Sequence, residues 1–140
     1  MCLLLLGWKA DARYPLVLAA NRDEYYARPT AAAGWWPDHP EILAGRDLQG
    51  GGTWLGLHAG GRLAALTNFR EPGQSRSDAR SRGALLQEFL VSGETPEEFR
   101  KRLALEGTGY NGFNLIFGDL AAGLYHYSNR SGKPAERLTP

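Results

Sequence analysis

Apolar residues in this 140-residue chain occur in short runs between polar or glycine-rich connections, and this spacing restricts the fold most strongly. Runs over residues 3–8, 16–20, 53–58 and 62–68 have strand length, as do later runs over 113–118 and 124–127. Residues 83–91 suit a helix, and Thr95, Pro96 and Glu98 form a capping box that predicts a second helix ending at Gly107. This order predicts one α+β domain with antiparallel strands over residues 1–140.

Two segments of the chain lack an apolar run of strand or helix length. We expect residues 28–47 to form a loop, because Pro29, Pro37 and Pro40 lie within this segment. Residues 70–82 are polar and predict a mobile loop that carries Arg70, Arg76, Arg80 and Arg82. Two interpretations of these arginines stay open: a solvated flexible segment, or a positive patch that attracts an anionic ligand.

Charge and cysteine content exclude several classes of protein. The formal net charge of +1 gives no electrostatic argument for binding nucleic acid or an anionic membrane. No apolar run is long enough to span a membrane. The one cysteine, Cys2, cannot form an intrachain disulfide, so we expect a cytoplasmic location. His39, His58 and His126 have no metal-ligand spacing, and no metal site is expected.

Cys2 directly follows Met1, which is normally removed before a small residue. The mature chain would then carry a thiol and an α-amino group on one residue, and an amine with a pKa of about 8 can act as base for the thiol. Asp23 could hold the ammonium form, and Arg22 could favour the thiolate. The alternatives are that Cys2 is only a small buried residue and that residues 21–24 form an ordinary polar turn.

A series of segments stands in order along the chain. They are Met1-Cys2, residues 18–29 with Asn21-Arg22-Asp23-Glu24, and residues 51–56, 63–69 and 110–115. This series closely resembles the NRDE family, also called the transport and Golgi organisation protein 2 family. That family is distantly similar to the N-terminal nucleophile hydrolases of the choloylglycine hydrolase and penicillin V acylase group. The resemblance implies an αββα sandwich with antiparallel sheets, of which residues 1–140 would be the N-terminal part, because family members are usually longer.

The resemblance also implies roles for individual residues. Cys2 would be the nucleophile, Asp23 would contact the α-amine, and Asn68 would help to form the oxyanion hole. Arg22 stays a candidate, although the amidases carry their arginine a few residues before the aspartate. The candidates for substrate binding are Asn21, Trp54, Asn111 and Asn114. Trp54, like Trp35 and Trp36, could instead belong to the core, where aromatic residues are more often found.

Three functions follow as alternatives. The first is an amidohydrolase that cleaves a linear amide. The second is a non-catalytic protein that binds and transports haem or a lipid or acyl ligand, with Cys2 as a ligand for haem iron. The third is a structural fragment that needs a partner chain, so a homo-oligomer is a further expectation.

Overall fold

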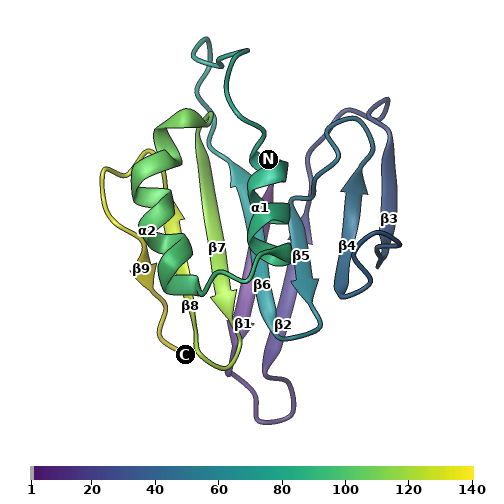
Figure 1. Cartoon of the computed structure of the whole chain (residues 1–140), viewed down its shortest axis with the longest axis vertical. Helices are drawn as coiled ribbons and strands as arrows, with labels where there is room; N and C mark the ends of the chain where they lie inside the picture. Colours follow the sequence, from purple (N-terminus) through teal and green to yellow (C-terminus); the bar gives the residue numbers. More distant parts are fainter. Residues whose placement is uncertain (1) are drawn as a thin grey trace.

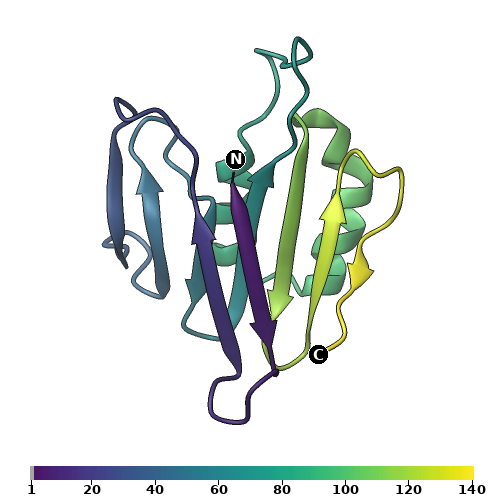
Figure 2. The same ribbon diagram turned by 180° about the vertical axis from the view of Figure 1, so that it is seen from behind.

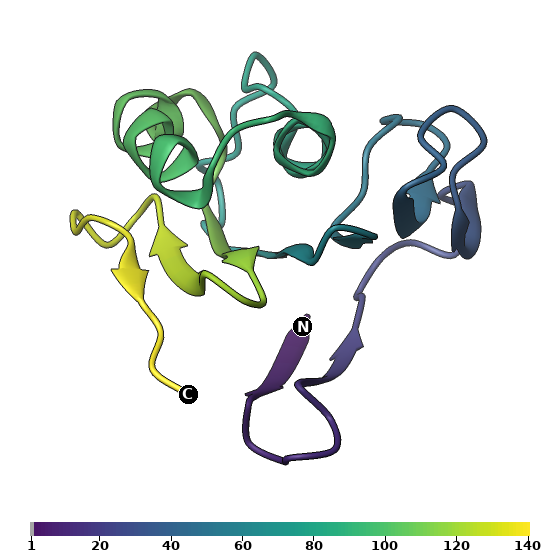
Figure 3. The same ribbon diagram turned by 60° about the horizontal axis from the view of Figure 1, so that its bottom comes forward.

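Helices, a large sheet and a small sheet form three successive layers in the computed structural model, which describes residues 2–140 (Figure 1). Figure 3 shows the two helices on one side of the large sheet and a hairpin on the other. The arrangement is α+β with antiparallel sheets, as predicted, and it is compatible with part of an αββα sandwich. Met1 lies outside the described residues, so its removal stays a prediction.

The hairpin consists of β1 (Leu3–Trp8) and β2 (Leu16–Asn21). The strands pair antiparallel from Leu3 opposite Asn21 to Trp8 opposite Leu16, which confirms the predicted hairpin. Since side chains alternate along a strand, one face of the hairpin points to the large sheet and the other to solvent. Leu4 and Leu6 are half-buried on the inner face, whereas Leu5 is exposed on the outer face. The hairpin lies in front of the large sheet in Figure 2.

Seven antiparallel strands form the large sheet, in the order β3-β4-β5-β6-β7-β8-β9. Their bounds are Thr30–Trp35, Ile42–Asp47, Leu55–His58, Arg62–Asn68, Phe113–Asp119, Gly123–Ser128 and Glu136–Arg137. The pairing of β6 with β7 runs from Arg62 opposite Asp119 to Asn68 opposite Phe113. Each strand therefore lies beside its neighbours in the chain, with both helices inserted between β6 and β7.

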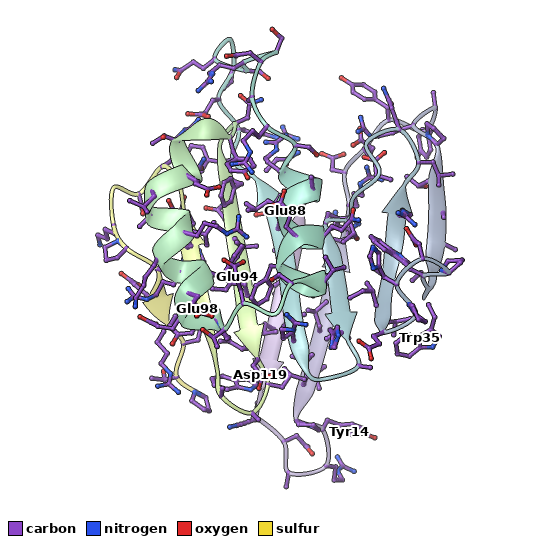
Figure 4. All side chains as sticks on the ribbon, viewed as in Figure 1. Tyr14, Trp35, Glu88, Glu94, Glu98 and Asp119 are labelled. Atoms are coloured by element: carbon purple, nitrogen blue, oxygen red, sulfur yellow. The ribbon has the colours of Figure 1, made fainter. Side chains whose placement is uncertain are left out.

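The predicted loop over residues 28–47 is wrong, because this segment contains β3 and β4. Pro29 precedes β3, and Pro37 and Pro40 lie in the turn that follows it, so the prolines flank the strands and interrupt neither. The turn is closed by Trp36, whose backbone N–H donates to the Ile42 carbonyl at 3.0 Å. The Trp36 side chain is buried, whereas its neighbour Trp35 is exposed at the outer edge of the sheet (Figure 4).

Helices α1 (Arg82–Val91) and α2 (Pro96–Glu106) cover the other face of the sheet, and a short 3₁₀ turn, η1 (Gly107–Gly109), follows. The predicted capping box of α2 is confirmed: the Thr95 hydroxyl accepts the Glu98 N–H, and the Glu98 carboxylate accepts the Thr95 N–H. In the layer between, the rings of Phe89, Phe99 and Phe117 have centroids 4.5–5.7 Å apart. Neither helix in residues 2–140 is long and apolar enough to cross a lipid bilayer.

A smaller apolar cluster joins the hairpin to the sheet. Trp8 packs there with Leu63 of β6 and Leu124 of β8, and all three are buried. The Trp8 indole N–H donates to the Leu120 carbonyl at 3.1 Å. The remaining contacts come from partly buried leucines, so the hairpin is held by fewer buried side chains than the helices are.

Candidate functional site

The hairpin register determines where Cys2 lies. Cys2 directly precedes β1, and its partner strand β2 ends at Asn21, so residue 2 lies beside the turn over residues 22–24. The Asn21 side-chain oxygen accepts the Leu3 N–H at 3.0 Å, and the Asp23 N–H donates to Cys2 Sγ at 3.3 Å. Two parts of the predicted site are therefore in direct contact.

A cavity of about 770 Å³ opens beside this turn. It extends between the hairpin and the large sheet to the start of α1. Its lining includes most of the residues predicted from the sequence, namely Cys2, Arg22, Asp23, Trp54, Asn68 and Asn111. The volume is in the usual range of small-molecule sites, which is roughly 300–1,000 Å³.

Two predicted residues, Asn21 and Asn114, do not line the cavity. Asn114 lies on β7, where its side-chain amide donates to the Thr67 hydroxyl of β6 at 3.4 Å. Asn111 does line the cavity, but both ends of its amide bind the backbone of Arg76, at 2.8 and 3.0 Å. Asn111 thus holds the loop over residues 70–81 beside the cavity.

Arg22 belongs to an ion-pair network on the cavity wall. It lies 3.1 Å from Glu24 and 3.7 Å from Asp47, which also accepts two hydrogen bonds from Arg28 at 2.7 and 2.9 Å. Burial alone would raise the pKa of Asp47, but the hydrogen bonds from Arg28 and from backbone N–H groups leave that pKa below its ordinary value. The pKa of Arg28 is raised, chiefly by its hydrogen bond to Asp47. The charge of Arg22 is therefore matched by carboxylates.

Asp23 lies at the more open end of the site. Its carboxylate is 2.9 Å from the guanidinium of Arg70, which comes from the loop over residues 70–81. The two side chains are 49% and 72% exposed, so this ion pair contributes little stability. The predicted partner of Asp23 is the α-amino group of Cys2. That group becomes free only when Met1 is removed, so its contact with Asp23 stays a prediction.

Glycines allow the cavity wall to approach the start of α1 closely. A side chain at Gly52 would place its Cβ 2.3 Å from the backbone carbon of Gly83, a distance that no real contact tolerates. The Thr53 N–H donates to the Gly83 carbonyl at 3.3 Å. Gly52, the last residue of the glycine run, thus permits close backbone packing against the start of the helix.

The family whose model matches residues 1–140 is described as Transport and Golgi organisation 2. The chain belongs to this family. It is 42% identical over 153 residues to the Transport and Golgi organization protein 2 homologs of Bos taurus and Homo sapiens, with 100% of this chain and 54% of each relative covered. The Drosophila melanogaster protein, Transport and Golgi organization protein 2, is 33% identical over 112 residues, which cover 74% of this chain and 39% of the relative. The chain spans about half the length of the mammalian relatives.

In this member of the Transport and Golgi organisation 2 family, sequence reasoning missed Arg28 and Asp47. Their pairing joins positions 19 residues apart, and no local pattern predicts it. A local signal for Asp47 did exist, because an aspartate shortly before glycines favours a turn closed by its own carboxylate. Asp47 Oδ1 does accept the N–H groups of Gln49 and Gly50, both at 3.0 Å.

Histidines and acidic residues do not gather into a metal centre within residues 2–140, where no group of three or more His, Cys, Asp or Glu side chains could hold an ion. His58 lies instead against Glu41, with 2.9 Å between Nε2 and Oε2.

Proposed function

We propose that Cys2, once Met1 is removed, is the nucleophile that hydrolyses a linear amide bound in the cavity. One observation carries this proposal: Cys2 Sγ accepts the Asp23 N–H at 3.3 Å on the wall of a ligand-sized cavity. A strand that begins at the nucleophile would hold the attacking sulfur in position. The distant resemblance to the N-terminal nucleophile amidases that we infer from the sequence motifs also favours this proposal.

The reaction uses groups of this chain and one water molecule. The thiol proton of Cys2 passes to the α-amine, and the sulfur attacks the carbonyl carbon of the amide. The resulting oxyanion would receive a hydrogen bond from the Asn68 amide, and Asp23 would hold the ammonium group. The C–N bond breaks as the ammonium returns its proton to the leaving amine. Water then hydrolyses the thioester, which releases the acid and restores the thiol.

The single cysteine makes this proposal direct to test. Intact-mass measurement shows whether Met1 is removed, and every thiol-reactive label on the chain reports on Cys2 alone. We expect the mature parent protein to hydrolyse members of a panel of linear amides and to accumulate a thioester adduct on rapid quenching. The Cys2→Ala variant should do neither. Two results would contradict the proposal. Retention of Met1 would leave Cys2 without a free α-amine to act as base, and equal hydrolysis by the parent and Cys2→Ala would show that the Cys2 thiol is not the nucleophile.

Asn68→Ala and Asn114→Ala form a matched pair for the oxyanion donor. Both remove a strand-borne amide, but only Asn68 lines the cavity. Loss of one oxyanion donor lowers kcat by roughly 100-fold or more. Asn68→Ala should show that loss while Asn114→Ala keeps the parent rate, and equal rates in both variants would contradict the role of Asn68.

A second candidate is binding and transport of an apolar ligand without chemistry. It is favoured by the leucines that line the cavity between the hairpin and the sheet, among them Leu16, Leu18 and Leu57. The names of the relatives refer to transport. For haem, Cys2 is the residue that would hold the iron, because its thiol lies on the cavity wall and thiolates bind haem iron. A haem titration of the parent and Cys2→Ala tests the haem version of this candidate, and an unchanged haem spectrum with both proteins would refute that version. The cytoplasmic location stays a prediction.

A further inference from the structure

One arginine on the cavity wall differs from the others in its partners. The arginines of the lining are Arg22, Arg28, Arg46, Arg80 and Arg82. The first four pair with Glu24 at 3.1 Å, Asp47 at 2.7 Å, Asp38 at 2.7 Å and Glu106 at 2.7 Å, respectively. Within residues 2–140, no carboxylate lies within the 4.0 Å ion-pair distance of Arg82. No carboxylate of the described residues therefore balances its charge.

Arg82 is the first residue of α1, and its side chain is half-buried. Its Nη1 donates to the Gly112 carbonyl at 2.9 Å, which orients the guanidinium without neutralising it. Burial lowers the pKa of Arg82, as expected for a cation taken from water without a counter-charge. Arginine nevertheless stays protonated in proteins, so the group is a cation that keeps unused N–H donors.

The neighbouring carboxylate does not supply the missing charge. Glu71 lines a smaller hollow together with Arg82 and Asn68, but it is held by Arg130 at 2.6 Å. That pair lowers the pKa of Glu71, first through the hydrogen bond from Arg130. Asn68 lines both the hollow and the main cavity, so Arg82 is accompanied by an amide on the same wall.

We propose that Arg82 binds a carboxylate on the ligand of the cavity, so that the ligand is an anionic amphiphile. A guanidinium can bind a carboxylate through two parallel hydrogen bonds, which fixes the orientation of the ligand. The leucines between the hairpin and the sheet then contact its apolar part. This inference rests on the cavity being a ligand site, as in the proposed function, but it does not require hydrolysis. The carboxylate could belong to a free fatty acid or to an amide substrate.

Calorimetric titration of the full chain tests the proposal, with dodecanoate and dodecan-1-ol as probes of equal chain length. All titrations use the Cys2→Ala background, so that failure of catalysis has no effect on the result. We expect dodecanoate to bind about tenfold more tightly than the alcohol, the difference typical of one charged hydrogen bond. N-dodecanoyl-β-alanine serves as a third probe: tighter binding than dodecanoate would assign the carboxylate to an amide substrate, and weaker binding to a free acid.

Three arginine variants isolate the role of Arg82. Arg82→Gln should abolish the preference for dodecanoate, Arg82→Lys should retain part of it, and Arg80→Gln, which removes a paired arginine of the same wall, should leave it unchanged. Thermal unfolding of each variant verifies that it is folded. Three results would overturn the proposal. The first is that Arg82→Gln keeps the preference for dodecanoate, the second is that Arg80→Gln loses that preference as fully as Arg82→Gln does, and the third is that the Cys2→Ala protein without an arginine substitution binds neither probe. If Arg82→Gln is unfolded, Arg82→Lys decides the question: a folded Arg82→Lys that keeps the whole preference for dodecanoate would overturn the proposal.

Discussion

The large sheet and the hairpin contribute opposite walls of one cavity, but they bury their apolar side chains very differently. On β7, Phe113 and Phe117 are fully buried beneath the helices. On the hairpin, Leu3 and Leu5 remain 54% and 59% exposed. Among the described residues of β1 and β2, only Trp8 has a buried side chain. Local stability follows the density of buried apolar contacts, so the hairpin, which carries Cys2, should open before the sheet. The candidate site therefore lies between the large sheet, which has high local stability, and the hairpin, which has lower local stability.

Phe117→Ala should have the largest effect on stability. The side chain is fully buried against Phe89, Phe99 and Tyr125, and deleting such a ring costs about 4 kcal/mol of unfolding free energy. Urea unfolding measures the loss, with Leu105→Ala, at an 83% exposed position, as the control. A loss below about 1 kcal/mol would show that the sheet does not depend on this layer.

Leu6→Ala should weaken the hairpin by about 2 kcal/mol, near the lower limit for a leucine deletion, because Leu6 is only partly buried against the smaller cluster. Hydrogen exchange resolves the effect by region. Amides of β1 and β2 should exchange faster than those of β6 and β7 in the parent, and only the hairpin amides should accelerate further in the variant. Equal protection of both regions would contradict the comparison.

Asp47→Asn should cost about 1 kcal/mol, since it weakens the charged hydrogen bonds that tie the turn after β2 to β4. The folded pKa of Asp47 lies below the unfolded value of about 4. The stabilisation is therefore complete above about pH 4 and is lost as the pH falls through the folded pKa. Unfolding measured from pH 7 to pH 3 should show a shallower acid loss in the variant than in the parent, and parallel curves would exclude Asp47 as the source.

Leu5→Thr should change stability least, within about 0.5 kcal/mol, because the side chain is exposed and threonine suits a strand. Sedimentation at several concentrations gives a second measurement of the same variant. A larger loss of stability, or association in the parent that the variant lacks, would show that the outer face of the hairpin is covered in solution, and such association would agree with the homo-oligomer expected from the sequence.

Regular patterns in the sequence predicted much of the fold. The runs over residues 3–8 and 62–68 became β1 and β6, and the capping box at Thr95 began α2 as expected. Strands β3 and β4 escaped prediction, since prolines surround them and since alanine and glycine, which have weak strand preference, make up most of β3. Their position at the edge of the sheet depends on pairing with β5, which is a tertiary contact.

The candidate site was predictable where residues are close in sequence and less so where they are far apart. The turn over residues 22–24 directly follows strand β2, and the hairpin register places it beside Cys2. The interpretation of residues 70–82 as one basic loop concealed a difference among its arginines. Arg70, Arg76 and Arg80 have carboxylate partners, and Arg82 begins a helix. Only the three-dimensional arrangement of acidic residues distinguishes a paired arginine from an unpaired one.

The cluster that seats Trp8 also sets the order in which the molecule can be assembled. Leu63 and Leu124, the buried neighbours of Trp8, are synthesised long after it, and the carbonyl that accepts its indole N–H lies 112 residues further along the chain. During translation the hairpin can form at once, but the surface on which it docks is complete only after β8 has been synthesised. Within residues 2–140, strand β1 is thus seated only after β8 is available, and the cavity wall that carries Cys2 docks after the strands of the sheet that face it.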